Sequence, residues 1–79
     1  MNDNLLNQAF ILVFRTSINR KKDVRLLMPM LNACPEIINW HVDITDIDNV
    51  LRIESTHPDC LSVIEKIKQA GYMCEELNY

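Results

Sequence analysis

The sequence holds one glycine among its 79 residues, which excludes the phosphate-binding loops of the Walker and dinucleotide type, since these need several glycines. Its longest apolar run, residues 9–14, is far shorter than the roughly 20 residues that cross a bilayer. The opening residues 1–4 lack the basic start of a secretory signal. We therefore expect a cytoplasmic protein that does not insert into a membrane.

An excess of positive charge is also absent. The formal net charge is −3, which argues against broad binding to nucleic acid. The shortness of the chain predicts a single domain over residues 1–79, with an ordered core at about 10–77 and little room for an enclosed active site. Neither His41 nor His57 stands at a spacing from serine or cysteine that predicts a nucleophile pair, so we expect no enzymatic activity.

The hydropathy pattern predicts six elements in the order strand, helix, strand, strand, helix, strand. Residues 10–16 are rich in β-branched and aromatic side chains, residues 38–55 alternate as an antiparallel hairpin, and residues 73–77 supply a last short strand. Helical spacing covers about 20–33 and 58–70. This order predicts an α+β fold, the ferredoxin-like βαββαβ two-layer sandwich with one antiparallel four-stranded sheet and two helices on one face.

Local signals predict where the helices end and which faces they bury. Asn19 is a cap candidate for the first helix, Thr56 one for the second, and Gly71 is placed to end the second in the left-handed conformation. Pro29 should bend the first helix or shift its start. The predicted inner faces consist of Val24, Leu27, Met28 and Leu31 in the first helix, and of Leu61, Ile64 and Ile67 in the second, with Trp40 also turned inward.

Several segments together resemble one known family. They are residues 14–18 before the first helix, Val24 and Pro29 within it, residues 40–43 and 46–53 across the hairpin, and residues 70–72 before the last strand. Over residues 10–77 the chain resembles the heavy-metal-associated domain of copper chaperones and metal-transport ATPases.

The resemblance implies a metal site that this sequence lacks. In that family the loop before the first helix carries two cysteines separated by two residues, and the matching positions here are Arg20 and Asp23. A soft monovalent copper ion needs thiolate sulfur, and a guanidinium has no lone pair to offer. We therefore expect no metal at the family position and no cofactor.

The first helical turn instead carries three cations, Arg20, Lys21 and Lys22. Free amides at a helix start, together with these cations, suit a phosphate, a carboxylate or an acidic patch on a protein partner. We hypothesise an anion- or partner-binding site formed by this turn and Tyr72. The alternative is a solvated loop whose long side chains extend into water.

Three cysteines leave open a metal site elsewhere in the chain. Their spacings match no zinc module, and an odd count argues against a disulfide framework. Cys34 should end the first helix and Cys60 should open the second, three residues after His57, so these three groups form an alternative site for metal binding or trafficking. The helix start would then lower the pKa of Cys60. The other interpretation is that the three thiols are buried or unreactive.

One face of a two-layer sheet has no helix over it. Alternation places Ile11 and Val13 on that face, flanked by charged residues. This surface suits a homodimer, although an ordinary monomer also tolerates two exposed aliphatic residues.

Overall fold

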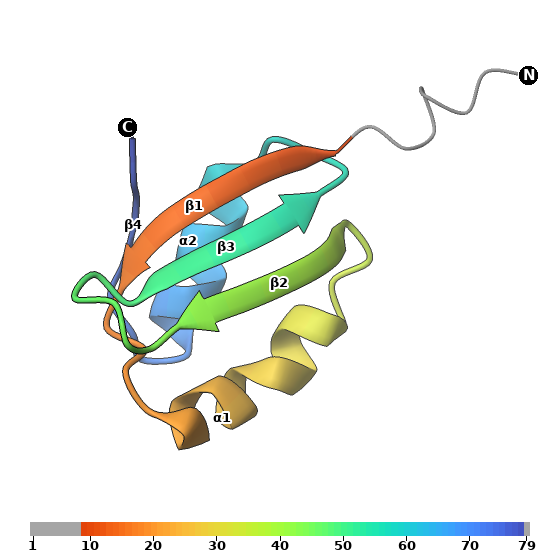
Figure 1. Cartoon of the computed structure of the whole chain (residues 1–79). Coiled ribbons are helices and arrows are strands. Elements are labelled where there is room, and N and C mark those ends of the chain that lie inside the picture. Colours follow the sequence, from red (N-terminus) through yellow and green to blue (C-terminus); the bar gives the residue numbers. More distant parts are fainter. Residues whose placement is uncertain (1–8, 79) are drawn as a thin grey trace, which may run out of the picture.

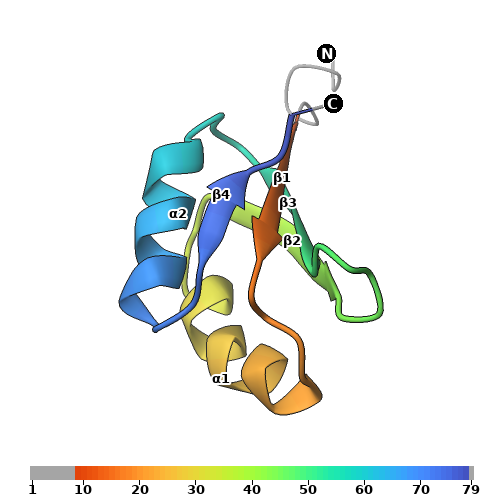
Figure 2. The ribbon, with the colours of Figure 1, turned by 90° about the vertical axis from the view of Figure 1, so that its left-hand side faces the viewer.

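The computed structural model describes residues 9–78, so residues 1–8 and 79 of the expected domain lie outside the described part. The elements are β1 (Phe10–Thr16), α1 (Lys21–Asn32), β2 (Ile37–Asp43), β3 (Val50–Ser55), α2 (Cys60–Gln69) and β4 (Cys74–Glu76). The strands form one antiparallel sheet in the order β2-β3-β1-β4. Both helices lie on the same side of it (Figure 1, Figure 2). The predicted α+β two-layer sandwich is confirmed.

The core lies between the sheet and the helices. In β1, every second residue points into it, so Leu12, Phe14 and Thr16 are buried while Ile11 lies on the open face. On the sheet side, the core is formed by the central strands β1 and β3, through the cross-strand pairs Phe14↔Leu51 and Leu12↔Ile53. The predicted bounds of β1 agree with the structure.

The helix α1 differs from expectation at its start and along one flank. Its N-cap residue is Arg20, which makes no side-chain cap bond, so the prediction of an Asn19 cap was wrong. Leu27 and Leu31 are buried as predicted, but Met28 is 42% exposed. The reason is the place of α1 beside β2, the outermost strand of the sheet (Figure 1). Within the described part of the chain, no further strand covers this flank of the helix.

The helix α2 begins at Cys60, and Asp59 caps it by accepting a hydrogen bond from the Ser62 backbone N–H at 3.1 Å. The prediction of a Thr56 cap was therefore wrong. Leu61 is 73% exposed rather than inward, because it lies about 200° around the helix from the buried Val63.

Among residues 9–78, two adopt positive φ, one in the loop after α2 and one in the turn between β2 and β3. Gly71 ends α2 with φ +98°, as predicted, and Asn49 closes the β2–β3 turn with φ +45°. Asparagine tolerates this conformation better than most side chains do. Neither helix of residues 9–78 is long and apolar enough to span a bilayer.

Candidate functional site

Three loops that are far apart in the sequence meet at the start of α1. The Ser17 backbone N–H donates to the Met73 carbonyl at 3.2 Å, and the Met73 N–H donates to the Ser17 hydroxyl at 2.9 Å. On the other side, the Thr16 hydroxyl donates to the Asn49 carbonyl at 2.6 Å and accepts from the Ile18 N–H at 3.1 Å. The loop that leads into α1 is therefore fixed by the β2–β3 turn and by the α2–β4 loop.

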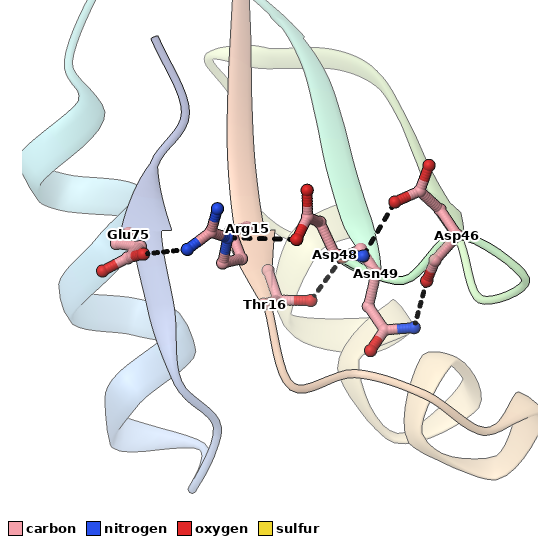
Figure 3. Close-up of polar contacts among 6 residues, drawn as sticks. All are labelled: Arg15, Thr16, Asp46, Asp48, Asn49 and Glu75. Atoms are coloured by element: carbon pink, nitrogen blue, oxygen red, sulfur yellow. Dashed lines mark hydrogen bonds and ion pairs between the residues drawn. The ribbon is translucent and has the colours of Figure 1, made fainter.

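The β2–β3 turn is held to the sheet by an exposed polar network (Figure 3). Arg15 reaches Asp48 at 3.2 Å on one side and Glu75 of β4 at 3.1 Å on the other. The Asp46 side chain accepts from the Asp48 N–H, and the Asp46 carbonyl accepts from the Asn49 side-chain amide. This network gives the turn a defined shape beside the loop into α1.

At the base of this loop lies a buried carboxylate, that of Asp23 in the first turn of α1. Its side chain is only 3% exposed. Tyr72 donates its hydroxyl proton to Asp23 Oδ1 at 2.8 Å, and Arg20 binds the same carboxylate with Nε at 3.2 Å and Nη2 at 3.4 Å. We call Arg20, Asp23 and Tyr72 the Asp23 cluster.

The electrostatics of the Asp23 cluster follow from these contacts. The Tyr72 hydrogen bond, followed by the bonds and charge of Arg20, lowers the pKa of Asp23 below its usual value, although burial acts in the opposite direction. The hydrogen bond to Asp23, with burial, raises the pKa of Tyr72. Asp23 is thus an ionised group that joins the start of α1 to the loop before β4.

The Asp23 cluster includes two residues of the predicted anion site. Arg20 and Tyr72 both bind the Asp23 carboxylate, while the Arg20 side chain stays 62% exposed. Lys21 and Lys22 are exposed, and within residues 9–78 neither forms an ion pair. Nothing in the sequence pattern marked Asp23 as buried, because its two partners are a cation three residues earlier and a tyrosine 49 residues later.

A groove of about 490 Å³ runs between α1 and β2. The helix wall of the groove is formed by Lys21, Val24, Arg25 and Met28. The strand wall is formed by Trp40, His41, Val42 and Ile44. The Trp40 indole N–H donates to Asn32 Oδ1 at 2.9 Å, which fixes the ring against the helix. The sequence analysis did not predict this groove. The pattern that could have indicated it is the i, i+3, i+4, i+7 spacing of the residues in its helix wall, which places them on one face of α1.

The alternative metal site is not assembled. Cys34 and His57 line a second cavity of about 390 Å³ near the end of α1, but Cys60 does not. The Cys34 thiol donates to the Met30 carbonyl at 3.4 Å, and His57 Nδ1 lies 2.8 Å from the Thr56 hydroxyl. In the described part of the chain, no three His, Cys, Asp or Glu groups gather closely enough to hold a metal ion.

The chemistry of the cysteines also differs from expectation. Burial, with the nearby Glu76 carboxylate, raises the pKa of Cys60, so the prediction that the helix start lowers it was wrong. Burial raises the pKa of Cys74 to about 11. Both thiols are therefore protonated at neutral pH, and of the two only Cys74 is buried.

On the open face of the sheet, Ile11 is 46% exposed, and Val13 is half-buried. His41 pairs with Arg52 across β2 and β3, and Arg52 pairs with Val13 across β3 and β1. The face therefore mixes apolar and charged groups, as the alternation predicted.

No protein-family model, curated protein or solved structure matches this chain. Its functional interpretation therefore rests on its own residues and geometry.

Proposed function

We propose that this chain is a small cytoplasmic binding module without catalytic activity, which binds an acidic partner or a small anion and needs no metal ion at the start of α1. The observation that carries the proposal is the Asp23 cluster. Arg20 and Asp23 stand where the resemblance to heavy-metal-associated domains places the two cysteines, and they bind each other. An internal ion pair thus holds this helix start together.

The cluster also separates the cations of the first turn into two groups. Arg20 is bound by Asp23, whereas Lys21 and Lys22 extend into solvent. The positive end of the helix dipole adds to the potential of these two lysines. Lys21 and Lys22, rather than Arg20 and Tyr72, are therefore the residues to which we assign the contact with an anion.

Native mass spectrometry tests the metal-independent part of the proposal. The reduced protein is measured anaerobically with monovalent copper or zinc and a competing chelator, beside the variant R20C/D23C as a positive control. We expect metal on the double variant and none on the wild type. Metal retained by the wild type and lost in Cys60→Ser would contradict the proposal and favour a metal-binding or trafficking function.

An NMR titration tests the anion-binding part. Inorganic phosphate and a short polyglutamate peptide are added to the ¹⁵N-labelled protein, and the amide shifts of the first turn of α1 are followed. We expect saturable shifts that Lys21→Ala with Lys22→Ala removes and that Lys68→Ala, on the exposed side of α2, leaves intact. Unchanged binding in the double variant would contradict the assignment.

Self-association through the open sheet face is a second proposal, favoured by the exposure of Ile11. Replacing Ile11 by lysine and Val13 by glutamate should then convert a dimer into a folded monomer. Sedimentation measures the mass, and an unchanged mass in the variant contradicts the proposal.

A further inference from the structure

The groove between α1 and β2 has the length of a short extended peptide. Its helix wall runs from Lys21 to Met28, which is about 10 Å at 1.5 Å per residue. Its strand wall runs from Trp40 to Ile44, about 13 Å at 3.3 Å per residue. Four or five residues of an extended chain span this length.

The edge of β2 that faces the groove is open. In the sheet order β2 stands at one end, so among residues 9–78 only β3 pairs with it. The Trp40 backbone N–H finds its partner in the side chain of the preceding Asn39, at 2.9 Å, and not in another strand. A peptide strand that displaces this one side chain can accept a hydrogen bond from the Trp40 N–H with one of its own carbonyl groups, as in other cases where a peptide adds a strand to a sheet edge.

The groove changes in chemistry along its length. At one end the floor is apolar, with Trp40 held in place by Asn32 and with Met28 42% exposed. Towards the start of α1 the rim carries Lys21 and Arg25, both exposed and, within residues 9–78, without an ion-pair partner. This positive rim contrasts with the net charge of −3 of the whole chain.

We propose that this groove binds an extended acidic peptide segment of a protein partner, which pairs with the free edge of β2. An apolar side chain of the peptide lies against Trp40 and Met28, and carboxylates two and four residues along the peptide lie beside Lys21 and Arg25. Alternate residues share a face of a strand, so both kinds of side chain point towards α1. This inference rests on the proposed function and deepens it, because the acidic partner uses Lys21 of that helix start together with Arg25 of the groove in place of Lys22.

The groove contains its own reporter, because Trp40 is the only tryptophan of the chain. The probe is the peptide acetyl-Ser-Leu-Thr-Glu-Thr-Glu-Ser-amide, and its control carries lysine in place of both glutamates. We expect the first to shift the Trp40 emission saturably and the second to leave it unchanged. Equal responses to both peptides would overturn the proposal.

Backbone methylation of the probe separates strand pairing from simple charge attraction. One version carries N-methyl groups on the odd-numbered amides and the other on the even-numbered amides, so only one version blocks the hydrogen bonds to β2. We expect one methylated peptide to lose binding and the other to retain it. Retention by both would overturn the proposal, as would a Trp40 response to octanoate as strong as that to the peptide.

Two variants locate the charge. Lys21→Glu with Arg25→Glu should weaken the probe about tenfold or more, whereas Lys22→Glu, outside the groove, should weaken it less than about threefold. If the two variants weakened binding equally, peptide binding in the groove would be contradicted, while the proposed function would still stand. Metal retained by the wild-type chain would contradict the proposed function but would not alter the Trp40 response.

Discussion

A single buried hydroxyl connects the β2–β3 turn to the loop that enters α1, and its removal gives the sharpest test of how the site is held. Thr16 is 3% exposed and donates to the Asn49 carbonyl (Figure 3). It also accepts from the N–H of Ile18, which is fully buried. Thr16→Val keeps the shape of the side chain and removes both hydrogen bonds.

The expected cost follows from the groups left without a partner. A buried polar group that loses its only partner costs about 1–3 kcal/mol. The Ile18 N–H bears this cost in full, while the Asn49 carbonyl is half-buried and recovers part of it from water. The sum is about 2–4 kcal/mol, against a total stability of about 4–12 kcal/mol for a chain of this length. The melting temperature should fall by roughly 10–25 °C.

Two control variants separate this effect from packing and surface charge. Thr16→Ser keeps both hydrogen bonds and loses one methyl group, at about 1 kcal/mol. Arg15→Ala removes the exposed pairs with Asp48 and Glu75, at under about 1 kcal/mol, and high salt should reduce even this difference.

Urea unfolding, followed by Trp40 fluorescence and by circular dichroism, measures the three free energies. The reasoning is refuted if Thr16→Val lies within about 0.5 kcal/mol of Thr16→Ser. That result would mean that water replaces both lost partners, and that the loop into α1 is more open than its buried Ile18 implies.

Three further predictions follow from the structure. Because the pKa of Asp23 is lower in the folded state, its ionised form stabilises the fold above about pH 4. This stabilisation is lost as the pH falls through the pKa of Asp23 in the folded protein. The melting temperature of Asp23→Asn should therefore decline less steeply towards about pH 2 than that of the wild type. Asp59→Ala should cost about 1 kcal/mol in urea unfolding and Thr56→Ala less than half as much, and the reverse order would contradict the cap. Cys74 should react with a thiol reagent at pH 8 only on unfolding, while fast reaction of the native protein would contradict its burial.

The sequence was sufficient to predict features that depend on local pattern. Alternating hydropathy located β1, and the single glycine at the end of a helical stripe located the left-handed turn at Gly71. These predictions succeeded because the residues that decide them are neighbours in the chain. The element order then predicted the two-layer sandwich, since few topologies accommodate it.

The candidate site depends on long-range contacts, and these escaped prediction. Asp23 looked like a lost metal ligand, but Tyr72, which arrives from the loop before β4, makes it a buried partner of Arg20. The spacing of Met28 in the sequence placed it on the buried face of α1. The sheet ends at β2, however, so the Met28 side chain is only partly covered. Periodicity predicts the direction of a side chain and does not predict what lies opposite to it.

The charge pattern of α1 links the Asp23 cluster to the groove. Lys21 and Arg25 stand four residues apart, where like charges destabilise a helix by about 0.2–0.5 kcal/mol, and positive charge at a helix start adds to this cost. Asp23, the acidic residue of the first turn, does not offset this destabilisation, because its carboxylate binds Arg20 and Tyr72. A surface shaped by stability alone would carry acids at these exposed positions. The double charge reversal that weakens the acidic peptide should therefore raise the stability of the free protein by about 0.5–1 kcal/mol, and a loss of both stability and binding would argue that the two cations serve the fold instead.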